Sequence, residues 1–229
     1  MKKILLATMA VLSVSALASE NNVYIKVGGD LYTNYNTISK EEGNVKTDLI
    51  TSDKGRGIGG FLEVTRNLTP EFEAGLGAGY IGRYDGKDHI IGEKDNKVKI
   101  NNPRYSSIPV YATAKFNIAN DSEITPYVKA DIGYAFNKIN GDLKQVEKVD
   151  NGAKDFESYK LKNSNGVYGG VGLGVEYNNF TAEVSYHHTN TALTIAPAKE
   201  VKDPKEIKGP SQAYSNNAVR LSVGYKFNF

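Results

Sequence analysis

The sequence predicts an all-β fold: an eight-stranded antiparallel up-and-down transmembrane β-barrel. Apolar and polar residues alternate with a period of two in eight segments of the 229-residue chain. Such alternation is expected of strands whose two faces have different surroundings. The connections between these segments alternate between short and long, as in a spanning barrel. After residue 18 no apolar run approaches the roughly 20 residues that a spanning helix needs.

The first eighteen residues have the pattern of a secretory signal peptide. Met1-Lys2-Lys3 is a short basic stretch, the residues from Ile4 to Val14 are mostly apolar, and Ala16-Leu17-Ala18 matches a cleavage site. The apolar stretch is too short for a spanning helix, so a retained anchor is the less favoured alternative. We therefore predict a cleaved signal peptide over 1–18 and a mature barrel domain over 19–229.

The amino-acid composition limits the classes of partner and covalent modification that we expect. The chain has 28 basic and 26 acidic residues, and removal of Lys2 and Lys3 leaves 26 of each. A neutral mature chain argues against nucleic acid as a partner. There is no cysteine to carry a lipid or a disulfide, and we expect no cofactor and no metal.

The predicted strands cover eight segments in chain order: 23–32, 57–66, 72–80, 108–116, 127–136, 167–177, 180–187 and 219–229. Three connections are short, and Asn178-Asn179 is typical of a two-residue hairpin turn. Four are long and polar, at about 36–56, 84–105, 138–165 and 190–216. Long loops therefore lie at one end and short turns at the other. With eight strands, both termini lie at the short-turn end, which places the turns in the periplasm and the loops outside the cell.

The predicted outward face suits a bilayer. Its middle consists mostly of Val, Leu, Ile and Ala, and aromatic residues stand near both ends of the strands. Rings at both interfaces are typical of spanning barrels. Those near the turns are Phe72, Phe116, Tyr177, Phe180, Phe227 and Phe229, and those near the loops are Tyr80, Tyr134, Phe136 and Tyr186.

Three stretches resemble small eight-stranded outer-membrane barrels, the family of the OmpA transmembrane domain, OmpX and Opa-like proteins. They are Thr125-Pro126-Tyr127-Val128, which opens a strand, the glycine-rich strand Val167–Tyr177, and the terminal Tyr225-Lys226-Phe227-Asn228-Phe229. Tyr225, Phe227 and the terminal Phe229 resemble the signal that the barrel-assembly machinery recognises. The resemblance implies an outer-membrane location, with that machinery and outer-membrane lipid as partners.

The inward faces of the predicted strands carry charges of both signs. An eight-stranded barrel is just wide enough for its own side chains, so isolated charges would be costly and pairing is expected. We expect Asp30 to pair with Arg220 where the first and last strands meet, and Asp131 to lie near Arg220 and His187. We also expect Lys226 to pair with Glu183. The predicted lumen charge cluster consists of Lys26, Asp30, Glu63, Glu73, Lys115, Lys129, Asp131, Glu176, Glu183, His187, Arg220 and Lys226. We interpret it as a polar plug, with a narrow gated ion path as the alternative.

One stretch has catalytic character. His187-His188-Thr189-Asn190 resembles the His-x-Ser-Asn of outer-membrane lipid A deacylases. Thr189 stands at the nucleophile position, however, and the predicted register turns both His187 and Thr189 inward. A nucleophile needs a base within hydrogen-bond reach and a third group that orients it. We therefore predict no catalytic residue, and a lipid-modifying enzyme is the third hypothesis.

Long polar loops on a rigid scaffold usually carry the binding role. By resemblance to OmpX and Opa-like proteins, these loops imply surface adhesion through a host or cell-surface ligand. We expect an outer-membrane protein with an envelope structural or adhesive role, with a narrow porin-class channel as the alternative.

Overall fold

The computed structural model describes residues 21–36, 38–42, 45–50, 56–84, 89–91, 98–100, 104–140, 144–150, 153–197 and 211–229. The predicted signal peptide lies outside these residues and stays a prediction. No helix in the described part of the chain is long and apolar enough to cross a membrane.

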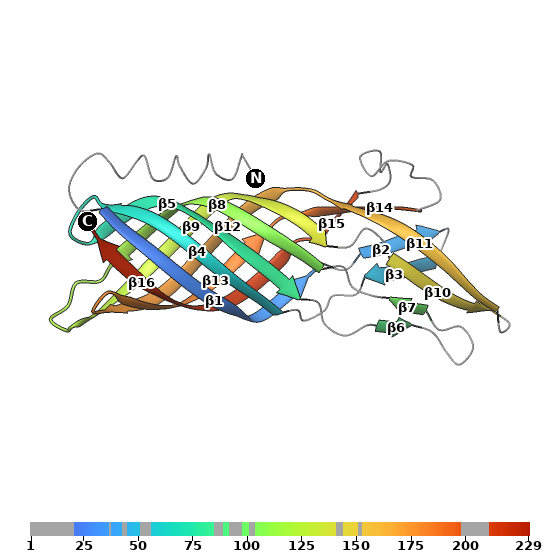
Figure 1. Cartoon of the computed structure of the whole chain (residues 1–229), viewed down its shortest axis with the longest axis horizontal. Helices are drawn as coiled ribbons and strands as arrows, with labels where there is room; N and C mark the ends of the chain where they lie inside the picture. Colours follow the sequence, from blue (N-terminus) through green and yellow to red (C-terminus); the bar gives the residue numbers. More distant parts are fainter. Residues whose placement is uncertain are drawn as a thin grey trace.

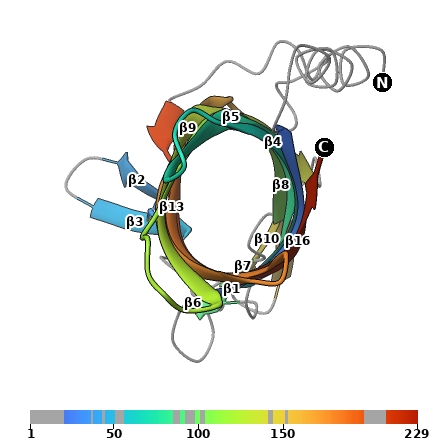
Figure 2. The same ribbon diagram turned by 90° about the vertical axis from the view of Figure 1, so that its left-hand side faces the viewer.

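Eight strands close into a barrel, in the order β1-β16-β13-β12-β9-β8-β5-β4. Each strand pairs antiparallel with its neighbours in the chain, and β1 pairs with β16 to close the ring, which Figure 2 shows end-on. The predicted eight-stranded up-and-down barrel is therefore confirmed. The strands are β1 Asn21–Tyr35, β4 Arg56–Asn67, β5 Phe72–Tyr84, β8 Arg104–Asn117, β9 Ile124–Asn140, β12 Gly166–Tyr177, β13 Phe180–Thr189 and β16 Asn216–Asn228.

The short turns lie together at one end of the barrel, beside the carboxyl terminus (Figure 1). The tightest joins β12 to β13 through Asn178 and Asn179, with φ angles of 45° and 70°. Two consecutive positive φ angles define the type I′ turn, whose twist matches that of the paired strands. Asparagine tolerates this conformation better than most residues, so the two-residue turn predicted from Asn-Asn is present.

One prediction about side-chain direction is wrong. Strict alternation from Tyr24 places Tyr32 inside the barrel, but Tyr32 is exposed on the outer wall next to Leu31. The β1–β16 pairing shifts between Asp30 and Tyr32, so Leu31 is an extra residue in the strand. A β-bulge of this kind reverses the alternation beyond it.

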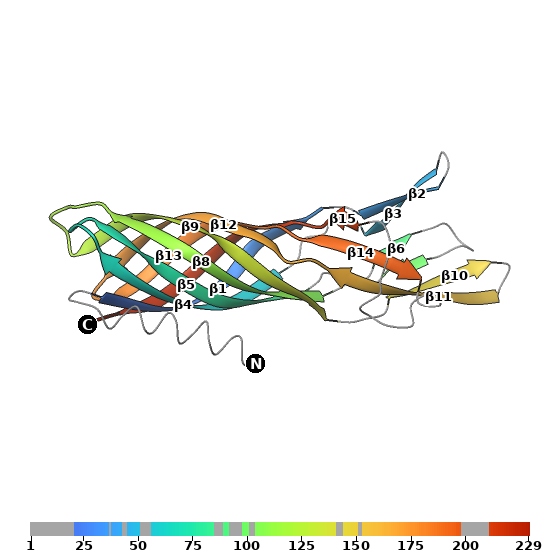
Figure 3. The same cartoon turned by 90° about the horizontal axis from the view of Figure 1, so that it is seen from above.

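The regions predicted as polar loops contain further strands. They are β2 Ile38–Glu42, β3 Val45–Ile50, β6 His89–Ile91, β7 Val98–Ile100, β10 Lys144–Asp150, β11 Ala153–Asn163, β14 Ala192–Pro197 and β15 Ser211–Ala213. β2 pairs with β3, β6 pairs with β7, and the other four form a sheet in the order β10-β11-β14-β15. We call all eight strands together the loop-side extension, which projects from the barrel end opposite the carboxyl terminus (Figures 1 and 3).

The barrel strands themselves reach beyond a membrane. β9 has 17 residues and β1 has 15, whereas a tilted transmembrane strand needs about 9–11. The surplus lies towards the loop side, where a buried cluster joins barrel and extension: Tyr35, Tyr105, Ile139, Leu161, Leu193 and Tyr214. The extension is therefore continuous with the barrel wall through paired strands and a small core of its own.

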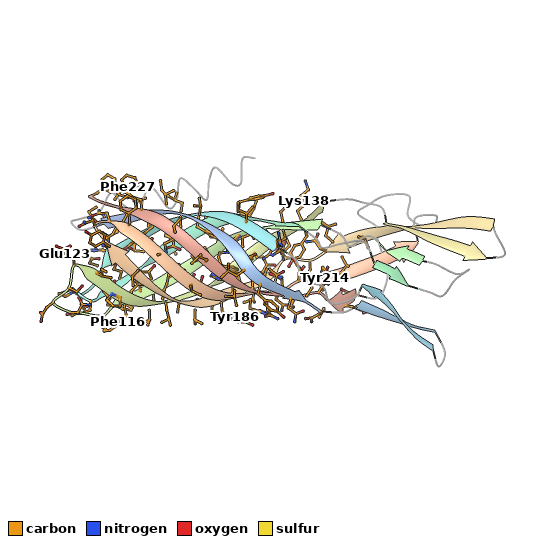
Figure 4. All side chains as sticks on the ribbon, turned by 90° about the horizontal axis from the view of Figure 1, so that it is seen from below. Phe116, Glu123, Lys138, Tyr186, Tyr214 and Phe227 are labelled. Atoms are coloured by element: carbon orange, nitrogen blue, oxygen red, sulfur yellow. The ribbon has the colours of Figure 1, made fainter. Side chains whose placement is uncertain are left out.

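The outer wall carries the predicted apolar belt. Val27, Ile132, Val171 and Leu173 are exposed along its middle. The rings near the turns and near the loops are also exposed or half-buried on this wall, and Figure 4 shows Phe116 and Phe227 at the turn end with Tyr186 towards the loop side. This continuous apolar surface with aromatic ends is the surface of a bilayer-spanning barrel.

Candidate functional site

All twelve residues of the lumen charge cluster lie on inward-facing positions of the barrel. Glu176 and Lys226, at the turn end, are half-buried, and the other ten are buried. Every charged member makes an ion pair with another member within the described structure. The cluster is organised in layers along the barrel axis.

The layer nearest the turns surrounds Glu73. Lys115 Nζ lies 3.2 Å from Glu73 Oε1 and 2.6 Å from Glu176 Oε2, and Lys226 Nζ lies 2.9 Å from Glu176 Oε1. Four neutral groups also donate to the Glu73 carboxylate at 2.8–3.2 Å: the side chains of Asn22, Tyr24, Thr65 and Asn117. A buried carboxylate with this many donors is well compensated for the loss of water.

The middle layer spans the barrel. Glu63 accepts from Lys26 at 3.0 Å and from Lys129 at 2.6 Å. Lys26 also contacts Glu183 at 3.2 Å, and Lys129 contacts Asp131 at 3.1 Å. β9, which carries Lys129, is not adjacent to β4, which carries Glu63. This ion pair therefore crosses the lumen and ties distant strands together.

The upper layer contains the Asp30–Arg220 pair at the barrel closure. Arg220 Nη2 and Nε lie 2.6 and 2.7 Å from Asp30 Oδ1, and the guanidinium carbon stands 4.9 Å from the Phe61 ring centroid. His187 is neighboured by Tyr168, whose hydroxyl is 2.9 Å from Nδ1. The two rings stack with centroids 5.4 Å apart.

Two predicted groupings differ from the structure. Lys226 does not pair with Glu183, because Glu183 lies opposite Ser222 in the β13–β16 register, four residues along the strand from Lys226. Lys226 contacts Glu176, and Glu183 contacts Lys26. Asp131 was expected near Arg220 and His187, but its partner is Lys129.

Aromatic side chains fill the lumen between the charges. The Tyr111 hydroxyl donates to Glu63 at 2.8 Å, and the Tyr127 hydroxyl donates to Glu183 at 3.2 Å. Each ring lies against an inward glycine: a Cβ on Gly77 would stand 2.5 Å from the Tyr111 ring. The glycines therefore make room for the rings. The alternation of the strands already turned these tyrosines inward, but the sequence prediction named only charged residues and His187 as lumen site residues.

Sequence reasoning also missed Arg83, which is 3% exposed near the loop-side mouth. Its guanidinium donates to Asn216 at 3.1 Å, to Ser107 at 2.5 Å and to Thr189 at 3.0 Å. These residues come from β16, β8 and β13, so Arg83 on β5 reaches across the barrel. The predicted strand ended at Tyr80; continuing its alternation by three residues would have turned Arg83 inward.

Arg83 also completes the charge balance. The predicted cluster has five cations and six carboxylates. With Arg83 included, the inward side chains of the described barrel strands comprise six cations and six carboxylates. Above it, the Tyr105 ring centroid lies 4.7 Å from the guanidinium carbon, and Tyr105, Tyr35 and Tyr214 form a group of rings with centroids 5.4–6.0 Å apart. The formal charges of these inward side chains thus balance, and aromatic rings cover the interior towards the loops.

A closed eight-stranded barrel with an apolar outer wall and a polar, charge-paired interior defines a transmembrane β-barrel protein. A family model described as outer membrane protein beta-barrel domain matches residues 4–227. The chain belongs to this family of outer-membrane barrels. An uncharacterised protein of Pasteurella multocida (strain Pm70) is 38% identical over 245 residues, which cover 99% of this chain and 98% of that protein.

Solved structures of similar fold have low sequence identity. Neisserial surface protein A is 12% identical with a TM-score of 0.44, and the match covers 92% of this chain and 100% of that one. Ail, the attachment invasion locus protein of Yersinia pestis, is 16% identical with a TM-score of 0.40 and the same coverage. The outer membrane enzyme PagL is 17% identical with a TM-score of 0.43, covering 89% of this chain and 98% of that one.

Proposed function

We propose that the chain is a surface-binding, adhesive barrel protein of the outer membrane, in which the loop-side extension carries the binding face and the lumen is a structural plug. The observation that carries the proposal is the organisation of the extension. Its strands pair with one another and are joined to the barrel by the buried cluster around Tyr105 and Leu161. Connections that only link strands need no such order, and long structured loops are usually functional.

The barrel interior supports the second part of the proposal, that the lumen is a structural plug. Lys26 and Lys129 each contact two carboxylates, and inward rings occupy the spaces between the charges. An interior that is filled with side chains and whose charges are paired stabilises strand register without an open path. The shared partners also permit a different pairing, so a narrow pore is the second candidate, and conductance discriminates between the two.

An enzymatic role has less support. Thr189, at the predicted nucleophile position, is buried in the lumen and accepts a hydrogen bond from Arg83. The His187 ring is hydrogen-bonded to Tyr168 and Ser185 inside the barrel. Neither group faces the lipid, where a lipid substrate would lie.

The test trims the extension and leaves the barrel intact. Lys144 and Tyr159 are directly paired across β10 and β11, so an Asn-Gly turn can replace residues 145–158 and still join them. Ser39 and Asp48 are paired across β2 and β3, so residues 40–47 can be replaced in the same way. The assay counts non-adherent Gram-negative cells that express each form and bind to an epithelial monolayer.

We expect cells with the full chain to bind, and trimming residues 145–158, alone or with 40–47, to reduce binding at least about tenfold. Surface amount and heat-modifiable gel migration serve as controls, and both should be unchanged because the barrel and its buried cluster remain. If the full chain confers no binding, or if both trimmed forms bind normally, the adhesive role is wrong.

A further inference from the structure

A polar group stands on the outer wall of the barrel, at the loop side of the apolar belt. His188 and Tyr186 are two positions apart on β13, both facing outward, and Asn217 on β16 pairs directly with His188. The Tyr186 hydroxyl lies 2.7 Å from Asn217 Oδ1, and His188 Nδ1 lies 2.7 Å from the same oxygen. We call these three residues the wall triad.

The hydrogen bonds of the wall triad determine which atoms remain for a ligand. An amide oxygen only accepts, so Tyr186 and His188 Nδ1 both donate to it. His188 in this tautomer keeps a lone pair on Nε2, and the two N–H bonds of Asn217 Nδ2 have no partner among the described residues. The wall triad therefore offers an acceptor and a donor close together, with no cation or carboxylate among its members.

The wall triad lies where the outer wall of the barrel meets the membrane interface. Tyr186 belongs to the band of aromatic residues near the loops, and His188 is two residues further towards the loops. We therefore place His188 at the depth of the lipid headgroups. Unpaired polar groups in hydrocarbon would be costly, which also favours the interface. On β12, His188 lies opposite Gly169, where an added Cβ would meet no atom closer than 3.5 Å. One side of the imidazole ring thus faces a position without a side chain.

We propose that the wall triad binds the hydroxyl-rich sugar headgroup of a glycolipid in the loop-side leaflet. A sugar hydroxyl both donates and accepts, which matches His188 Nε2 and the Asn217 amide. The exposed Tyr186 ring adds an amphipathic surface of the kind found at membrane interfaces. A phosphate group only accepts and carries negative charge, and the wall triad has no cation to balance it. The inference does not depend on the adhesive role of the extension.

The histidine ring signals in nuclear magnetic resonance spectra provide the test. The chain contains three histidines, so a mature chain labelled at His and refolded in phosphocholine detergent gives few ring signals, assigned with His188→Ala and His187→Ala. The probe is an alkyl glucoside added at increasing mole fraction. We expect a saturable shift of the His188 ring signals, while those of His187, inside the barrel, stay in place.

Variants separate specific binding from general detergent effects. Asn217→Ala should weaken the response about threefold to tenfold, since it removes one donor and releases the histidine tautomer. Tyr186→Phe should weaken the response, and Tyr80→Phe should not, because Tyr80 is a similarly exposed tyrosine (53% against 47%) outside the wall triad. A response that is linear, equal in Asn217→Ala, or as large when an alkyl phosphate replaces the glucoside would overturn the proposal.

Discussion

The carboxylate of Asp30 and the guanidinium of Arg220, 2.6 Å apart, join the first and last strands of the barrel across its closure. The two residues are direct partners in the β1–β16 register and lie 190 positions apart in the chain. Both are buried. An ion pair at this place makes the closure of the ring depend on one register of the terminal strands.

We expect Asp30→Ala to destabilise the folded barrel by about 3–5 kcal/mol, because it leaves the buried Arg220 charge without its partner. Urea unfolding in lipid vesicles, followed by heat-modifiable gel migration, measures the change. The double variant Asp30→Leu/Arg220→Met should lose less than the sum of the two single variants. Lys138→Ala, an exposed position, is the control, and an equal loss there would remove the special role of the pair.

Gly174→Ala should destabilise the barrel by about 1–3 kcal/mol through overpacking. The added Cβ would stand 2.3 Å from the Tyr127 ring and 2.7 Å from the Ala182 carbonyl oxygen. The same unfolding assay reports the change, and Tyr127→Leu in the same chain should recover part of it. Gly60→Ala is the matched control, since a Cβ there would stand 4.0 Å from its nearest neighbour, the Lys26 carbonyl oxygen. Equal losses at Gly60 and Gly174 would contradict the packing argument.

In planar bilayers, the refolded chain without the predicted signal peptide, residues 19–229, should show no discrete conductance steps. The physical reason is that paired charges and inward rings fill the interior, and Arg83 reaches across the loop-side mouth. Proteolysis and gel migration must show that the protein has inserted. Reproducible steps that change with Arg220→Ala or Glu183→Ala would instead establish the narrow-pore alternative.

Phe229→Ala should lower the amount of barrel assembled in cells several-fold and leave refolding in detergent nearly unchanged. The Phe229 side chain is 77% exposed, so it contributes little packing, whereas its backbone N–H and C=O hydrogen bonds to Asn21 remain in the variant. Outer-membrane fractions and in vitro refolding yields are compared. Phe180→Ala, another exposed turn-side ring, is the control; equal assembly defects would argue against a terminal recognition signal.

Much of the barrel could be predicted from local pattern. Alternation of apolar and polar residues identified all eight spanning strands, and Asn178-Asn179 identified the tightest turn. The same alternation found the inward charges, because the side-chain period of a strand is two. It did not extend through the bulge at Leu31, where one extra residue reversed the face of Tyr32.

Which charges meet could not be derived from the sequence. Lys129 contacts Glu63 across the lumen, and Lys26 contacts Glu183 past an intervening strand. Such contacts depend on the shear of the barrel, which sets the height of each strand against the others. A shift of a few residues changes every partner, which is why the expected Lys226–Glu183 pair does not form.

By itself, the sequence determined the class of fold, which face of most spanning strands points inward, and that charges of both signs lie inside, since these follow from periodicity and composition. Only the tertiary structure decided the ion-pair partners, the place of Arg83 and the sheet that the long loops build. Those features arise where strands far apart in the chain are brought side by side, and ring closure determines their relative heights.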